Sequence, residues 1–392
     1  MENNNTIPDF SLFGGPLQRL GRRLGLVRDG TNSFRLGLVL GLIAWGVLVV
    51  LAILQGVGQK VLSLSMVGIH IRFLVAVPLF FLCETWVAPR MAEFIRNIVR
   101  SGVVPEAGYP ALTSVVRRIG RLKDPWPAEV IFLAVVFGLP LIEMIFGLSG
   151  VPGKTGSLNS LLTESGGRFG PVLGWYLGFC LPLFRFLILR WLWHLGLWCY
   201  FLWRVQKLEL RLIPTHPDRT AGLGYLEIVQ EHFGALAFAI SAVLGASFAE
   251  EVASGKMTFE TLYLLIPAVV ILVAVLFVSP LLIFTPKLWM CRITGWSEYM
   301  GMASGYVKHF DRKWIRNENP SGESLLGTPD MQSLADLTNS VNVVREMRWI
   351  PAGQRILLSL SACAILPMLP LLLFKYPADQ LAIQLFKTLT GL

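Results

Sequence analysis

Seven long apolar runs constrain this chain more than any other feature, because they recur along almost its whole length. A helix needs about 20 mostly apolar residues to cross a bilayer. The runs that meet this need lie at 36–54, 67–87, 128–148, 171–189, 233–249, 263–284 and 356–374, and the fifth is the shortest. We therefore predict an all-α fold, a polytopic membrane helix bundle of about seven transmembrane helices.

The composition agrees with a membrane protein. Charged residues make up 15% of the 392 residues, whereas soluble domains carry about 25%. The five cysteines show no CxxC spacing, and four of them lie in or beside apolar runs. They indicate small buried side chains rather than disulfides or a zinc site. We expect no cofactor, and the sequence leaves metal binding undetermined.

Lysine and arginine predict the orientation. The segments 1–35, 89–127, 204–232 and 285–355 hold 25 of these residues, while the alternating segments 55–66, 149–170, 250–258 and 375–392 hold six. Basic residues gather on cytoplasmic loops, so the N-terminus is predicted to be cytoplasmic and the C-terminus external. The formal net charge of +9 then indicates contact with anionic lipid on the cytoplasmic face, not with nucleic acid.

One stretch leaves the span count open. Residues 171–203 are apolar for over thirty positions and could form two spans, which would invert everything after them. We prefer one span that continues as a helix into the interface, because its second piece, 191–203, is short and rich in tryptophan. The chain then divides into an N-terminal amphipathic segment (1–35), the membrane bundle (36–376) with a cytoplasmic segment (285–355), and an outer amphipathic segment (377–392).

Several amphipathic helices are predicted outside the lipid. Residues 13–27 carry Leu17, Leu20 and Leu24 among arginines, and an apolar stripe follows Pro110; both are typical of helices on the inner leaflet. A helix should also begin near Pro329, where Thr-Pro-Asp supplies a cap and a first-turn proline. Its apolar residues are Leu334, Leu337, Val341 and Val344.

Charged and histidine residues within the spans are the first candidate site, because charge at bilayer depth is costly and usually paired or in contact with water. These residues are His70, Arg72, Glu84, Glu143, Arg185, Arg190 and His194. Depths counted at about 1.5 Å per residue predict two ion pairs, Arg72–Glu143 and Glu84–Arg185. The pairs either fix the packing of spans two to four or line a wet cavity.

The second candidate site is the loop that follows the fourth span. It contains His-Pro-Asp and then Gly-Leu-Gly, and its candidate residues are His216, Asp218, Gly222, Gly224, Glu231 and His232. A metal or anion site is one interpretation. A packed turn is the other, with a capping aspartate and glycines that allow close approach.

The residues at 216–218 and 222–224, together with 330–337 (Asp-Met-Gln-Ser-Leu-Ala-Asp-Leu), carry a resemblance. Over about forty residues the chain resembles a group of uncharacterised bacterial multi-pass inner-membrane proteins. The resemblance implies a bacterial inner (plasma) membrane location. It implies no activity, substrate or catalytic residue.

Two functions remain as hypotheses. The first is movement of a small polar solute or ion through a charged cavity between spans two to four. The second is a membrane sensor or scaffold that binds a protein partner, or a further copy of the chain, through segment 285–355. Catalysis is the less favoured class, because the protease motifs HExxH and GxGD are absent and no catalytic residue is assigned.

Overall fold

The computed structural model describes residues 10–14, 16–27, 33–123, 129–138, 170–316 and 329–375. Within these ranges the chain is helical and contains no strand. Six of the helices are long and apolar enough to cross a membrane, so the protein is an all-helical, multi-pass membrane protein. These six run Phe34–Leu54, Val67–Arg100, Pro171–Gln206, Tyr225–Ala253, Phe259–Ile315 and Gln354–Phe374.

Several of the long helices are composites of α-helical, 3₁₀ and π segments. The second comprises α4 (Val67–His70), the π segment η2 (Ile71–Ala76) and α5 (Val77–Arg100). The third comprises α9 (Pro171–Trp175), the π segment η4 (Tyr176–Cys180) and α10 (Leu181–Gln206). The third continues unbroken through the tryptophan-rich piece 191–203. Of the expected span 128–148, only the short apolar helix Glu129–Gly138 falls within the described residues.

The remaining helices complete the bundle. At the N-terminal side are α1 (Pro16–Arg23), α2 (Phe34–Leu54), α3 (Gly58–Val61), η1 (Leu64–Met66), η3 (Glu106–Gly108) and α6 (Tyr109–Leu122). The C-terminal half contains α11 (Tyr225–Glu231), α12 (Gly234–Ala253), η5 (Phe259–Thr261), α13 (Leu262–Val278), η6 (Ser279–Phe284), α14 (Thr285–Phe310), η7 (Asp311–Ile315), α15 (Pro329–Arg345), α16 (Gln354–Ile365) and η8 (Leu366–Phe374).

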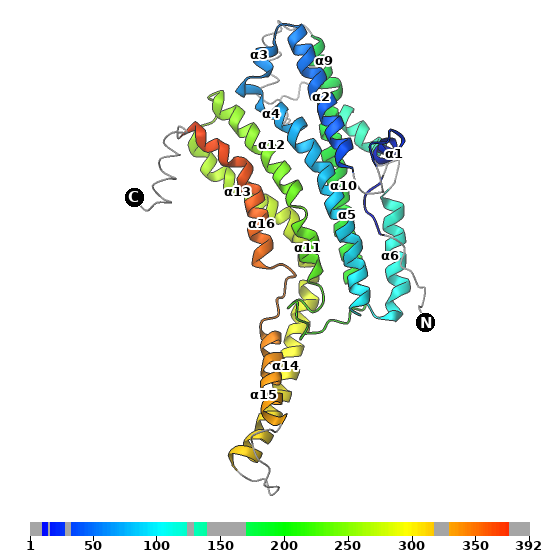
Figure 1. Ribbon diagram of the computed structural model, residues 1–392, viewed down its shortest axis with the longest axis vertical. Coiled ribbons are helices and arrows are strands. Elements are labelled where there is room, and N and C mark those ends of the chain that lie inside the picture. Colours follow the sequence, from blue (N-terminus) through cyan, green and yellow to red (C-terminus); the bar gives the residue numbers. More distant parts are fainter. Residues whose placement is uncertain are drawn as a thin grey trace.

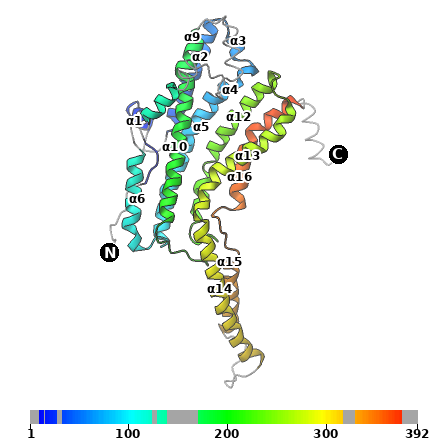
Figure 2. The ribbon, with the colours of Figure 1, turned by 180° about the vertical axis from the view of Figure 1, so that it is seen from behind.

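A helical hairpin projects from the bundle along the long axis of the molecule. It consists of α14 and α15, which lie side by side beyond the ends of the other long helices (Figures 1 and 2). The apolar stripe expected on α15 supplies this contact, since Val344 is fully buried and Leu334, Leu337 and Val341 are partly buried.

The N-terminal segment differs from the expected surface helix. Leu20 and Leu24 are more than half exposed, whereas Gln18 and Gly21 face the bundle. The helix is shorter than expected, at Pro16–Arg23. Gln18 donates a hydrogen bond to the buried Glu84, and this contact determines which face of α1 is buried. The spacing of the leucines does not predict that face.

Helix α6 carries the expected apolar stripe, but the stripe packs against α10 instead of facing the inner leaflet. Leu112, Val115, Val116 and Ile119 are buried, while the arginines between them are exposed. The expected outer helix at 378–389 lies outside the described residues.

Candidate functional site

A buried ion pair joins the second and third long helices. Arg190 of α10 donates to Glu84 of α5, and the two side chains are 4% and 1% exposed. The other carboxylate oxygen of Glu84 accepts a hydrogen bond from Gln18 Nε2 at 3.2 Å. Arg190 Nη2 also donates to the carbonyl oxygen of Gly14 at 3.3 Å. The N-terminal segment therefore closes over the pair.

The expected partner of Glu84 was Arg185, and this expectation was wrong. Arg185 is only half-buried, and the carboxylate pairs with Arg190 five residues later. Depth counting assumes one uniform helix, but the π segments η2 and η4 precede the two charges. A π segment changes the register of the helix that follows it, and a count of depth does not tell which arginine faces the neighbouring helix.

A second buried cluster lies nearer the other end of the same helices. Arg72 Nη1 donates to the hydroxyl of Tyr176 at 3.0 Å. Glu250 of α12 accepts a hydrogen bond from the backbone N–H of Gly68 at 2.7 Å. Arg72, Tyr176 and Glu250 are each less than 8% exposed.

Sequence reasoning missed Tyr176 and Glu250. Glu250 was assigned to an outer loop, but α12 continues to Ala253 and buries it. The expected partner of Arg72, Glu143, lies outside the described residues. A tyrosine in an apolar run gave no separate signal, because its hydroxyl becomes informative only when a buried cation lies beside it.

The two histidines of the spans have different surroundings. Trp45 Nε1 donates to His70 Nδ1 at 2.7 Å, and His70 Nε2 lies 2.8 Å from the carbonyl oxygen of Val61. This arrangement requires the neutral tautomer with its proton on Nε2. His194 is buried against the rings of Phe13 and Trp191. Both arrangements support packing roles.

The His-Pro-Asp loop is organised around one carboxylate. Asp218 accepts hydrogen bonds from the backbone N–H groups of Thr220, Gly222 and Gly224 at 2.8 to 3.2 Å. His216 Nδ1 lies 2.8 Å from the same carboxylate. Burial raises the pKa of Asp218, but these hydrogen bonds outweigh it and hold the pKa below its usual value. Of the two interpretations of this loop, the hydrogen bonds of Asp218 correspond to a packed turn with a capping aspartate.

The other two candidate residues lie apart from this turn. Glu231 pairs with Arg355 at 3.3 Å, and His232 Nδ1 lies 2.7 Å from the carbonyl oxygen of Ile228. Within the described ranges, no group of three His, Cys, Asp or Glu side chains could hold a metal ion. The structure therefore does not bring the loop candidates together as one ligand set.

Arg348 ties this loop to the base of the hairpin. Its guanidinium donates to Glu227 at 3.0 Å and to the carbonyl oxygen of Asp218 at 3.4 Å. Its backbone N–H donates to the carbonyl oxygen of Arg219 at 2.7 Å. Arg219 and Ala221 adopt positive φ angles of 57° and 55°, which are uncommon for residues with a side chain. The loop therefore supports the hairpin at its point of exit from the bundle.

Hydrogen bonds also fix the far end of the hairpin. Lys313 and Trp314 both donate to the Asp330 carboxylate at 3.0 Å, and the Tyr306 hydroxyl donates to the Asp330 carbonyl oxygen at 2.9 Å. Arg292 donates to the carbonyl oxygen of Arg345 near the base. The two helices are thus joined at both ends, and they present a defined surface.

That surface carries an exposed apolar stripe on α14. Its members recur at steps of four and three residues, and each large side chain is 38–49% exposed. We call this the α14 stripe, which consists of Trp289, Ile293, Trp296, Met300, Ala303 and Val307. This spacing is that of a seam that packs against another helix. α15 covers a different face of α14, where Gly295 meets Val344.

Comparisons with known proteins do not assign this arrangement to a family. A scan against protein-family models finds no match. Searches of curated proteins and of solved structures also find none. The site is therefore interpreted from its own geometry.

Proposed function

We propose that this protein is a membrane-anchored docking protein that binds a partner protein along the α14 stripe. The observation that carries the proposal is the row of exposed apolar side chains on α14, which lies outside the bundle and is held in place by hydrogen bonds to α15. Contiguous exposed apolar surface on a protein commonly marks an interaction site. The lysine and arginine distribution supports a cytoplasmic hairpin, and the sequence resemblance supports a bacterial inner membrane.

Lipid does not account for the whole stripe. From Trp289 to Val307 the stripe extends roughly 27 Å along the helix axis, at about 1.5 Å per residue. The polar interface of a bilayer is only about 5 to 8 Å deep on each side. Because the hairpin continues along the long axis of the molecule (Figure 1), headgroups can cover only the first turns of the stripe.

The charges of α14 and η7 indicate the chemistry of the partner. Residues 285–316 hold six lysines and arginines but only two acidic residues. A second copy in the same membrane would lie parallel and oppose like charges. We therefore propose that the partner contributes an amphipathic helix whose apolar face meets the stripe and whose flanks are acidic.

The transport hypothesis has less support. The carboxylate of Glu84 is occupied by Arg190 and Gln18, and Arg72 donates to Tyr176. Side chains from the protein thus satisfy these charges in the described part of spans two to four. Hydrogen bonds between side chains of neighbouring membrane helices also hold helices together, and these contacts favour that role.

Site-specific photo-crosslinking in the full chain tests the proposal. A photoreactive residue would replace Ile293 or Met300 in cell membranes, and a matched control would replace the exposed Thr338 of α15. We expect one partner to be captured at both stripe positions and not at the control. An adduct between two copies of the chain, or none at the stripe, would overturn the proposal.

Binding of the captured partner then provides a quantitative test. Hot-spot side chains at interfaces contribute about 2 kcal/mol or more each. We expect Ile293→Glu combined with Met300→Glu to weaken binding more than tenfold, while Ala335→Glu combined with Thr338→Glu leaves it unchanged. Binding should also weaken as salt is raised, because the complementary charges lie at the exposed edges of the contact.

A further inference from the structure

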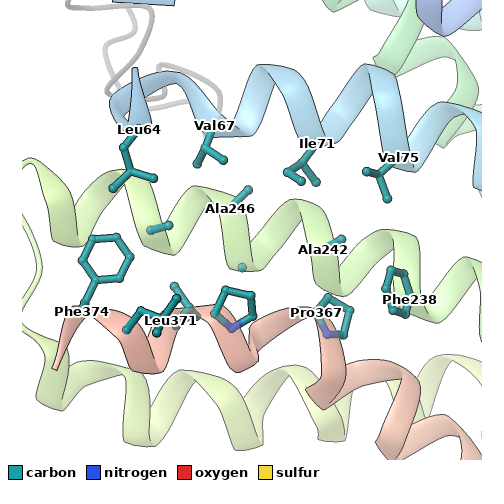
Figure 3. A pocket seen from close by; sticks show the side chains of 14 residues that line it. Leu64, Val67, Ile71, Val75, Phe238, Ala242, Ala246, Pro367, Leu371 and Phe374 are labelled. Carbon is teal, nitrogen blue, oxygen red and sulfur yellow. The ribbon is translucent and has the colours of Figure 1, made fainter. Parts of the chain in front are cut away.

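An apolar groove runs along α12, between the helix that begins at Val67 and the C-terminal segment η8 (Figure 3). Its volume is about 540 Å³. One wall carries Leu64, Val67, Ile71 and Val75, and the opposite wall carries Pro367 to Phe374. Neither the polar clusters nor the α14 stripe includes this groove.

Small residues and prolines create the hollow. Ala242, Gly245, Ala246 and Ala249 of α12 form its floor. The facing segment η8 is a 3₁₀ helix that contains two prolines, so it is narrower than an α-helix. Together they leave a space that larger side chains would have filled.

Hydrocarbon is the occupant that fits this space. The lining residues are apolar throughout, and water occupies a cavity only where several polar groups can bind it. An unfilled apolar hollow would also lose dispersion contacts on all its walls. From Leu64 to Val75 the groove extends about 16 Å at 1.5 Å per residue, which matches the depth of one leaflet, about 15 Å.

A basic residue stands at one end of the groove. Leu64 and Phe374 lie together at that end, whereas Val75, Phe238 and Pro367 lie at the other (Figure 3). Lys375 follows Phe374 directly and is exposed. Its ammonium group lies 2.8 Å from the Tyr263 hydroxyl, and the residue itself is one position beyond the last groove-lining residue, Phe374.

We propose that this groove is a binding site for one anionic glycerophospholipid, with an acyl chain along α12 and the phosphate at Lys375. The chain enters from the leaflet at the Lys375 end. The ammonium group contributes the headgroup preference, because one basic residue near an anionic lipid contributes about a fivefold preference. This site is independent of the proposed docking function.

Native mass spectrometry of the full chain tests the proposal. The protein would be reconstituted in nanodiscs of phosphatidylglycerol and phosphatidylcholine in equal amounts, and the lipid retained after detergent washing would be counted. We expect wild type to retain one lipid, with phosphatidylglycerol preferred roughly fivefold. Lys375→Gln should retain the lipid but lose this preference.

Groove-filling variants complete the test. Ala246→Trp places an indole on the floor and should abolish retention, while Ala362→Trp is the matched control on an exposed part of α16. If Ala246→Trp does not fold, Ala242→Phe replaces it. Retention by a folded groove variant equal to that of the control, or an unchanged preference in Lys375→Gln, would overturn the proposal.

Discussion

At the scale of single residues, the buried charges of this protein stabilise it through specific partners. Glu84 contacts both Arg190 and Gln18. The Asp218 carboxylate accepts hydrogen bonds from the backbone N–H groups of three residues in its own turn. A buried charge that loses its partner costs more than a pair contributes, because the remaining charge is uncompensated.

The first prediction concerns the buried ion pair. Glu84→Gln leaves Arg190 without its counter-charge, and breaking a buried pair costs about 3–5 kcal/mol. We expect a marked fall in the thermal unfolding midpoint, followed by tryptophan fluorescence in detergent. Combining it with Arg190→Met should recover part of the loss.

Arg185→Gln is the control for this prediction, since Arg185 is the other arginine at similar depth and is only half-buried. We expect its effect to be small. Equal losses for Arg185→Gln and Glu84→Gln would contradict the pairing.

The second prediction concerns pH. The pKa of Asp218 lies below its usual value in the folded protein, so the unfolded chain binds the proton more readily. The stabilisation is therefore complete above the unfolded pKa of about 3.9 and is lost as pH falls through the folded pKa. We expect Asp218→Asn to lower stability at neutral pH and to remove this part of the acid dependence, measured as the unfolding midpoint against pH.

At the scale of elements, close helix packing depends on glycines of α2. A Cβ on Gly41 would meet the carbonyl oxygen of Phe73, and one on Gly37 would meet the ring of Phe81. Glycine at four-residue spacing allows membrane helices to approach closely. The π segment that contains Phe73 thus packs against α2 with little space between the backbones.

The third prediction tests this contact. Gly41→Ala forces the helices apart, and overpacking costs about 1–3 kcal/mol. Gly46→Ala on the same helix is the matched control, because its Cβ would enter open space. We expect only Gly41→Ala to lower the unfolding midpoint in detergent, and a loss of equal size in both variants would contradict the close contact.

At the scale of the whole molecule, the second and third long helices run in the same direction. Arg72 contacts Tyr176 and Glu84 contacts Arg190, so the residue numbers rise together along both helices. If both helices span the membrane, the chain must return across it between residues 100 and 170. The described residues contain six helices that could span, and the seventh crossing near 128–148 stays a prediction.

The fourth prediction is a topology map made with single cysteines in a background without the five native ones. Cysteines at Ser101 and Gln332 should react with an impermeant thiol reagent from one side of the membrane. Cysteines at Leu62 and Ser254 should react from the other side. The reason is that α5 ends just before Ser101 and α12 ends just before Ser254, and these two ends lie at opposite ends of the bundle (Figure 1). Reaction of Ser101 and Leu62 from the same side would contradict the arrangement.

The class of fold and most of the long helices could be predicted from the amino-acid sequence alone. An apolar run can be recognised from consecutive residues alone. A helix can span the membrane when the run is long enough to cross the hydrocarbon core. The apolar stripes of α6 and α15 could also be predicted, because the three- and four-residue spacing of apolar residues along a short segment indicates an amphipathic helix. The capping turn around Asp218 was one of two interpretations that the loop sequence left open.

Which side chains contact one another follows from the packing of the helices and could not be predicted in this way. The choice of Arg190 over Arg185 depends on the rotation of one helix about its axis, which π segments change without a clear mark in the sequence. The burial of Gln18 and Glu250, the α14 stripe and the groove along α12 likewise depend on which faces other helices leave uncovered. Packing between distant segments fixes those faces, so no local pattern could specify them.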